Sequence, residues 1–371
     1  MSGATSKLLG MVAALGSGAG LAIQSAMNGA LAVPLGSGLM ASPVSFLVGV
    51  ATLLLVAPFK LGQKPRDKGP NPKPLYWWHW CTGGSIGVCY ICAGTFLGPK
   101  LGYGLFFCSV VAGQIITSLV LDHIAFLDLR RQPVTVWRVG STVVVLVGAV
   151  LAIVDKVDVA LGVGKLVGFV LLSFASGCLM AIQAPINSSL TIRFGTLPHR
   201  TALISFSVGT LYILVIWGIS VGVKGRGLAD VHVSESEPFM WFGGVLGVLY
   251  VVASVSLAPI LGVGLFVVFV VFGQLFMSLF IDVFGLFASN SISATPLRIV
   301  GVVLVFVGAA GFRMLPLRLS SCPCAGQVSK AGEPTTSAEQ KMHEQRAEVE
   351  DPSEDEADVA YASAPAGLAR V

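Results

Sequence analysis

The sequence predicts an all-α integral membrane protein in which ten transmembrane helices form two inverted five-helix repeats, followed by a disordered acidic C-terminal tail. Two observations predict this class. Hydrophobic residues make up 54% of the 371 residues and charged residues only 11%, whereas about a quarter of a soluble domain is charged. In addition, a ten-residue pattern with an amide and a carboxylate occurs twice inside long apolar runs.

The duplicated pattern is Gly-Gln-x-x-x-Ser-Leu-x-x-Asp, which begins at Gly113 and again at Gly273, 160 residues later. Amides and carboxylates cost free energy inside a membrane. Chance would not place them twice in the same register, so the pattern indicates a duplication within a membrane protein.

Apolar runs of about 18 to 25 residues recur along the chain, and each could cross a hydrocarbon core of about 30 Å as a helix. Membrane strands would instead alternate over about ten residues, and the sequence shows no such alternation. The first run resembles a signal peptide, but it has a twin in the second half, so we expect it to be retained. The predicted spans are 8–32, 42–59, 76–97, 101–122, 134–154, 164–190, 201–222, 239–258, 261–283 and 296–316.

Each span of the first half has a counterpart in the second. The first helices share Ile-Gln-x-x-x-Asn, the second share Ser-Phe-x-Val-Gly, the third share Gly-Gly-x-x-Gly-Val-x-Tyr, and the fourth carry the pattern described above. Because five is odd, the second unit must cross the membrane in the opposite orientation. The shared motifs begin at Ile23 and Ile182, Ser45 and Ser205, and Gly83 and Gly243. The predicted repeats are 1–160 and 161–318.

Lysine and arginine counts near the span ends predict that both termini are cytoplasmic. The decisive segment is the Lys-rich loop 60–74 between the second and third spans. From residue 319 the chain is rich in Ser, Ala, Glu and Asp, and we expect 319–371 to be a disordered cytoplasmic tail.

The sequence carries no signature of an enzyme, a cofactor site or a metal site. Gly162-Val163-Gly164-Lys165 resembles part of a phosphate loop, but its spacing does not fit. The Cys89-x-x-Cys92 pair lacks a second pair of ligands. Basic residues do not alternate with aromatic residues on a soluble domain, so we expect no nucleic-acid partner.

Amides within the spans are the candidate substrate-binding residues. Gln24 and Asn28 lie four residues apart, on one helix face, and their counterparts repeat the spacing. Two interpretations are open: the amides line a cavity, or they only hold helices together. The glutamines of the duplicated pattern are candidates on the same grounds. The candidates are Gln24, Asn28, Gln183, Asn187, Gln114 and Gln274.

The two aspartates of the pattern have a different predicted role. Arg138 follows Asp122 by sixteen residues, and Arg298 follows Asp282 by the same distance. We favour an ion pair that closes each helix-to-helix corner, and the alternative is proton coupling.

The ten helices and the paired motifs together resemble the drug/metabolite transporter (DMT, EamA-like) superfamily, and within it the YdcZ-like inner-membrane exporters. The resemblance covers residues 8–316. It implies that helices one to four and six to nine surround a central cavity, with five and ten at the periphery. The Lys-rich loop and the acidic tail depart from the family pattern.

These observations predict a secondary transporter, an exporter that works by alternating access. Almost no lysine or arginine lies within the spans, so the cavity should suit neutral, zwitterionic or cationic metabolites or drugs rather than phosphorylated ones. The expected partners are a small-molecule substrate and the bilayer of a plasma or inner membrane, and a homodimer is compatible with the sequence. The alternative function is a non-transporting scaffold or accessory subunit that recruits partners through the acidic tail.

Overall fold

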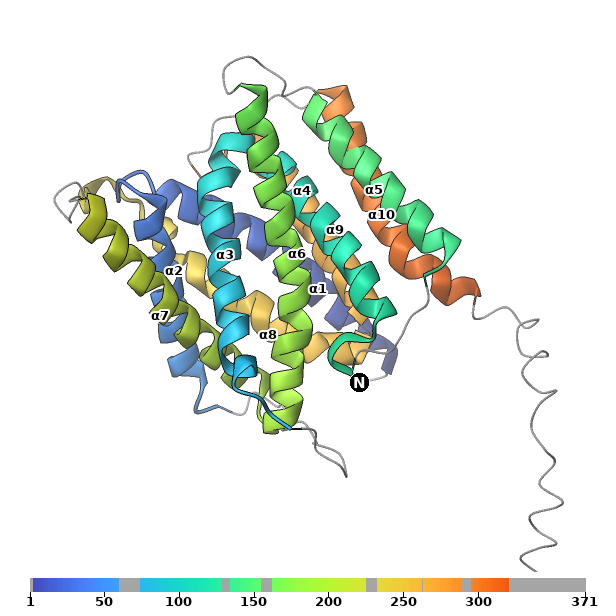
Figure 1. Ribbon diagram of the computed structural model, residues 1–371, viewed down its shortest axis with the longest axis horizontal. Helices are drawn as coiled ribbons and strands as arrows, with labels where there is room; N and C mark the ends of the chain where they lie inside the picture. The colour runs from blue at the N-terminus through green and yellow to red at the C-terminus, as the bar shows by residue number, and fades with distance from the viewer. Residues whose placement is uncertain are drawn as a thin grey trace, which may run out of the picture. The chain divides into compact units, whose positions relative to one another are not determined.

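The structure is a computed structural model that describes residues 3–59, 74–128, 134–154, 162–224, 232–261, 263–287 and 295–319. The described residues form ten α-helices and three short 3-10 helices (Figure 1). Residues 60–73 of the Lys-rich loop and residues 320–371 of the predicted tail lie outside the described residues. The first half contains α1 (Gly3–Leu31), α2 (Gly38–Val56), α3 (Trp78–Leu101), α4 (Tyr103–His123), η1 (Phe126–Asp128) and α5 (Val136–Val154). The second half contains α6 (Val163–Phe194), α7 (Pro198–Lys224), η3 (Val233–Glu235), η4 (Pro238–Phe242), α8 (Gly243–Leu261), α9 (Val263–Phe284) and α10 (Pro296–Leu319).

Each predicted span is matched by one helix, so the prediction of an all-helical bundle is confirmed. Within the described ranges, eight helices are long and apolar enough to cross a membrane, judged by length and composition. In α5 and α10 the described residues contain shorter apolar segments, Val136–Leu151 and Pro296–Gly311.

The ends of the two first helices show the repeat in backbone geometry. Gly36 follows α1 and Gly195 follows α6, and both have φ of +68°. This left-handed conformation costs a side-chain-bearing residue free energy and suits glycine at a helix C-terminus. The N–H of Gly195 donates to the carbonyls of Thr191 and Ile192, which satisfies the end of α6.

The two halves pack against one another helix by helix, in matching pairs. The first helix of each half packs on the fourth and third helices of the other half: α1 lies against α9 and α8, and α6 lies against α4 and α3. The helices α2 and α7 contact each other, as do α4 and α9, and α5 and α10 run side by side at one edge of the bundle (Figure 1). The core therefore lies between the halves, and each pairing has its symmetric counterpart.

Glycines allow these helices to approach closely. A Cβ atom at Gly18 would lie 2.0 Å from the carbonyl oxygen of Val270, and one at Gly177 would lie 2.0 Å from that of Val110. Gly113, the first residue of the duplicated pattern, makes a similar close contact: a Cβ atom there would lie 2.1 Å from the carbonyl oxygen of Phe174. Small residues at such contacts let backbones pack in van der Waals contact.

The peripheral pair α5 and α10 offers a test of this packing. A Cβ at Gly148 would lie 2.6 Å from the carbonyl oxygen of Gly301, whereas one at Gly140, on the same helix, would meet no atom within 4 Å. We expect Gly148→Val to destabilise the protein by about 1–3 kcal/mol through overpacking. The measurement is thermal unfolding in detergent, with Gly140→Val as the matched control. Equal melting temperatures for the two variants would contradict the packing described here.

Candidate functional site

The four amides of the first helices are all buried, and they come from opposite halves of the chain. Gln24 and Asn28 lie on α1, and Gln183 and Asn187 lie on α6, each pair about one helical turn apart. Because α1 and α6 occupy equivalent places in the two halves, the four amides form two symmetric sets inside the bundle.

Three of the four amide nitrogens donate hydrogen bonds to neighbouring helices. Asn28 Nδ2 and Gln24 Nε2 donate to Ser45 Oγ on α2, at 3.2 and 3.4 Å. Gln183 Nε2 donates to the carbonyl oxygen of Gly83 on α3, at 2.6 Å. Gln24, Asn28 and Gln183 therefore each join their own helix to another, which is the contact that the helix-holding interpretation requires.

The asparagine oxygens lie over the first glycines of the Gly-Gly-x-x-Gly motifs, Gly83 on α3 and Gly243 on α8. A Cβ at Gly83 would be 2.2 Å from Asn187 Oδ1, and one at Gly243 would be 2.4 Å from Asn28 Oδ1. Among the described residues neither oxygen has a hydrogen-bond partner. The Gly-Gly-x-x-Gly motif is thus the surface on which the asparagines of the opposite half rest.

The two glutamines line a cavity between the halves, whereas the two asparagines do not. This central cavity is small in this state, with a volume of about 30 Å³. Its lining residues are Leu21, Gln24, Phe46, Gly84, Gly87, Tyr90, Ile91, Met180, Gln183, Ser205, Phe206, Gly247, Tyr250 and Val251. Twelve of these fourteen form six repeat pairs, among them Gln24 with Gln183 and Tyr90 with Tyr250. The central cavity therefore lies where the two halves meet symmetrically.

A second cavity adjoins the first. This side cavity is larger, with a volume of about 100 Å³. Met180 and Tyr250 line both cavities, so the two are neighbours along one path. The lining residues are Gln114, Ser118, Leu121, Asp122, Met180, Ala181, Ala184, Pro185, Ser188, Tyr250, Ser254, Phe266, Val267 and Val270. These residues lie on the C-terminal half of α4, on α6, on α8 and on the N-terminal half of α9, so the side cavity lies toward the end of the bundle where α4 ends.

The predicted corner residues form two buried ion pairs. Arg138 Nη2 donates to Asp122 Oδ2, and Arg298 Nη2 donates to Asp282 Oδ2. The arginines are 1% and 2% exposed. Each pair joins the fourth helix of a half to the fifth, and it places a compensating cation beside each buried carboxylate.

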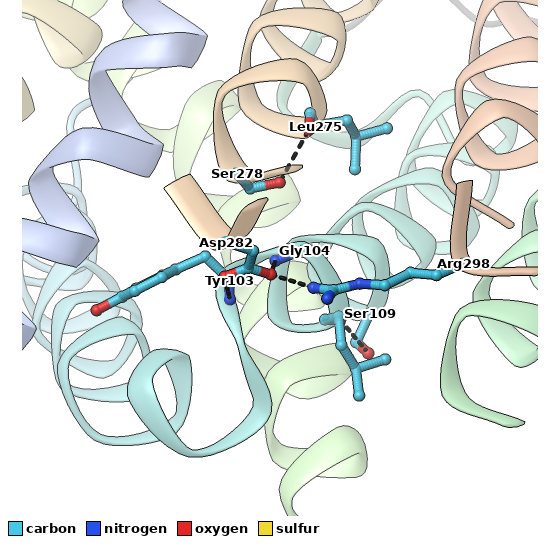
Figure 2. Close-up of polar contacts among 8 residues, drawn as sticks. Tyr103, Gly104, Ser109, Leu275, Ser278, Asp282 and Arg298 are labelled. Atoms are coloured by element: carbon cyan, nitrogen blue, oxygen red, sulfur yellow. Dashed lines mark hydrogen bonds and ion pairs between the residues drawn. The ribbon is translucent and has the colours of Figure 1, made fainter. Parts of the chain in front are cut away.

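Asp282 makes two further contacts that the sequence did not predict. Its carboxylate accepts hydrogen bonds from the backbone N–H groups of Tyr103 and Gly104, both at 2.7 Å (Figure 2). These groups open α4, where the helix dipole favours a negative charge. Asp282 therefore links α9, α10 and the first turn of α4.

Comparison with known proteins can now be set beside this geometry. The profile of the DMT_YdcZ family, described as "putative inner membrane exporter, YdcZ", matches residues 9–151 and again residues 168–311. The chain belongs to this family. The two matches correspond to the two helical repeats, and they establish an integral multi-pass membrane protein of an exporter family whose substrate is unknown.

Two other comparisons add little to the YdcZ assignment. No curated protein matches the chain. A solved structure titled "Crystal structure of protein" is similar with a TM-score of 0.45 and 16% sequence identity, over 85% of this chain and 99% of the other. A likeness of that size supports no argument about function.

Sequence reasoning missed the aromatic residues of the central cavity. Tyr90 and Tyr250 end the Gly-Gly-x-x-Gly-Val-x-Tyr motif, which served only as evidence of the repeat, and Phe46 and Phe206 belong to the second-helix motif. Their presence in both repeats was the available signal. For this YdcZ protein, the cavity wall is thus mainly aromatic and aliphatic, with two amides.

The glutamine of the duplicated pattern has different surroundings in the two halves. Gln114 lines the side cavity, whereas Gln274 is 0% exposed and both of its amide atoms lack a hydrogen-bond partner among the described residues. Throughout the residues that the structure describes, no group of three His, Cys, Asp or Glu side chains is placed to hold a metal ion.

Proposed function

We propose that the protein is a secondary transporter that exports small neutral, zwitterionic or cationic molecules by alternating access. The observation that carries the proposal is the central cavity, whose lining comes in repeat pairs from both halves. Transporters built from inverted repeats bind substrate at the repeat interface, and their halves rock around that site. A cavity on the symmetry axis is the place where this movement would expose a substrate first to one side and then to the other.

The proposed substrate class follows from the charge and chemistry of the cavity walls. The central cavity is lined by no charged side chain. The side cavity is lined by one, Asp122, and that carboxylate is paired with Arg138. An anion entering either cavity would find no free arginine or lysine among the lining residues, so phosphorylated or carboxylated compounds would be poorly compensated. The aromatic faces of Tyr90 and Tyr250 suit apolar or cationic groups, and the glutamines supply hydrogen bonds.

The proposed binding residues are Gln24 and Gln183, with Gln114 in the side cavity. The hydrogen bond from Gln183 Nε2 to Gly83 O shows that these amides also contribute to helix packing. The two roles are compatible, because the oxygen of an amide can serve a ligand while its nitrogen is held by the protein.

Orientation decides the direction of the proposed export. We propose that both termini are cytoplasmic, as the distribution of lysine and arginine indicates. The side cavity would then face the cytoplasm, because it lies at the end of the bundle where α4 ends and where the chain begins. A substrate leaving the cell would enter by this cavity.

Uptake by purified protein in liposomes tests the function. The full chain and a variant lacking residues 320–371, which follow α10, are each given a panel of neutral, zwitterionic, cationic and anionic compounds. We expect at least one compound of the first three classes to be transported by both proteins at similar rates. If the intact protein moves nothing from the panel, the transporter proposal is contradicted and the scaffold alternative is favoured.

A further inference from the structure

The two halves of the chain are not in the same state, although their sequences match. Along the duplicated pattern, Gln114 is 8% exposed, and Ser118 is half-buried and lines the side cavity. Their counterparts Gln274 and Ser278 are each 0% exposed. The counterpart of the side cavity, between α1, α3, α4 and α9, is therefore packed where the side cavity is hollow.

Tyr103 packs into this region. A Cβ at Gly98 would lie 2.4 Å from the ring of Tyr103, and one at Gly29 would lie 2.4 Å from its hydroxyl oxygen. The hydroxyl donates to the carbonyl oxygen of Ser25 at 3.4 Å. Figure 2 shows the ring extending away from the Asp282–Arg298 pair. The tyrosine is 2% exposed, so its ring fills the space between α1 and α3.

The residues around Tyr103 have counterparts that line the side cavity. Ser25 corresponds to Ala184 and Gly29 to Ser188, and both of these residues line it. Tyr103 itself corresponds to Val263, which has no ring. Phe107, which is 0% exposed, corresponds in turn to Val267, which lines the side cavity. The two halves thus differ by two aromatic side chains at the place where they differ in packing, and Tyr103 is the one that contacts Ser25.

We propose that the region between α1, α3, α4 and α9 is a second substrate route, closed in this state, and that Tyr103 is its gate. This inference rests on the proposed function and names the part of the protein that would open in the opposite state. When Tyr103 leaves the space beside Ser25 and Gly29, the route connects the central cavity with the end of the bundle where α4 begins. Substrates of the same neutral, zwitterionic or cationic class would pass along it.

The buried amide of Gln274 supports this exchange of states. An amide without partners inside a bundle costs free energy. Opening the second route would bring Gln274 and Ser278 into a cavity, as Gln114 and Ser118 are here, and would recover part of that cost. The backbone N–H groups of Tyr103 and Gly104 are held by Asp282, so the side chain can swing while the helix end stays anchored.

The two routes lead to opposite ends of the bundle. Tyr103 begins α4 and Asp122 lies near its end, and the helix has 21 residues. At about 1.5 Å per residue this separates them by roughly 30 Å. A thiol in each route should therefore react with reagents added to different sides of the membrane.

Thiol labelling in liposomes tests the gate without any substrate. The full chain, with its seven cysteines replaced, carries either Ser118→Cys or Ser278→Cys, and a membrane-impermeant maleimide is added to one side at a time. We expect Ser118→Cys to react from the side where α4 ends, and Ser278→Cys to react slowly and only from the other side. Adding Tyr103→Val should raise the rate at Ser278→Cys by about tenfold, whereas Tyr103→Phe, which keeps the ring, should raise it little.

A second variant covers the case in which Tyr103→Val does not fold. Val263→Tyr places a ring at the equivalent point of the second half, and it should slow labelling of Ser118→Cys by about tenfold. The gate would be overturned if folded Tyr103→Val left the labelling rate of Ser278→Cys unchanged, or if folded Val263→Tyr left that of Ser118→Cys unchanged. Labelling of both thiols from the same side would overturn it as well. Because labelling needs no substrate, the gate can fail while the uptake panel succeeds, or hold while the panel yields nothing.

Discussion

Replacing Asp282 with asparagine is expected to destabilise the protein by about 3–5 kcal/mol, the usual cost of leaving one member of a buried ion pair uncompensated. Arg298 is 2% exposed and would keep its charge inside the bundle. The backbone N–H groups of Tyr103 and Gly104 would lose a carboxylate acceptor at the first turn of α4. Three helices meet at this carboxylate, so a single change loosens all three.

Unfolding in detergent, followed by the fraction of monodisperse protein after heating, measures this effect. Glu235→Gln is the matched control, because it removes one negative charge from an exposed site and is expected to change little. The double exchange Asp282→Arg with Arg298→Asp restores the ion pair but not the acceptor for the two N–H groups, so we expect only partial recovery. An Asp282→Asn protein of normal stability whose transport has lost its pH dependence would instead make this aspartate a proton carrier.

Replacing both Gln24 and Gln183 with leucine is expected to lower transport by about tenfold to a hundredfold, because a ligand would lose two hydrogen bonds of about 0.5–1.5 kcal/mol each. Leucine has nearly the volume of glutamine, so the central cavity keeps its size. The change removes the amide groups that line the central cavity, together with the hydrogen bonds that Gln24 donates to Ser45 and Gln183 donates to Gly83.

Transport per folded molecule and thermal stability must be measured together for this pair. Asn28→Leu with Asn187→Leu is the control, since these asparagines are buried one turn away and do not line the cavity. We expect the asparagine variant to lose stability and to keep its transport per folded molecule. The reverse result, in which the glutamine variant melts early yet transports normally, would leave these amides with a packing role only.

The sequence predicted the helices and their pairing into repeats because membrane spans depend on local composition and because the duplication is visible residue by residue. It also located the amides and the corner pairs, whose polar groups stand out in apolar runs. The partners of these groups were not predictable. Gly113 packs against the backbone of α6, and Asp282 accepts hydrogen bonds from the first turn of α4. Both contacts depend on how the two halves pack together, and no local sequence pattern encodes them.

The different environments of the two halves were the hardest feature to foresee. Matching motifs predict matching surroundings, yet Gln114 lines a cavity whereas Gln274 is fully buried. One sequence difference that accompanies this asymmetry, Tyr103 against Val263, lies between residues that are glycine in both repeats. Its significance is visible only once Tyr103 is seen against Gly29 and Gly98.

The most direct test of the whole account is an experimental structure of the full-length protein with a compound that it transports. We predict that the compound lies in the central cavity, within hydrogen-bond distance of Gln24 or Gln183 and beside Tyr90 and Tyr250. A transported compound bound instead on the lipid-facing surface, with the central cavity filled by protein side chains, would contradict the assignment of substrate binding to the interface between the halves.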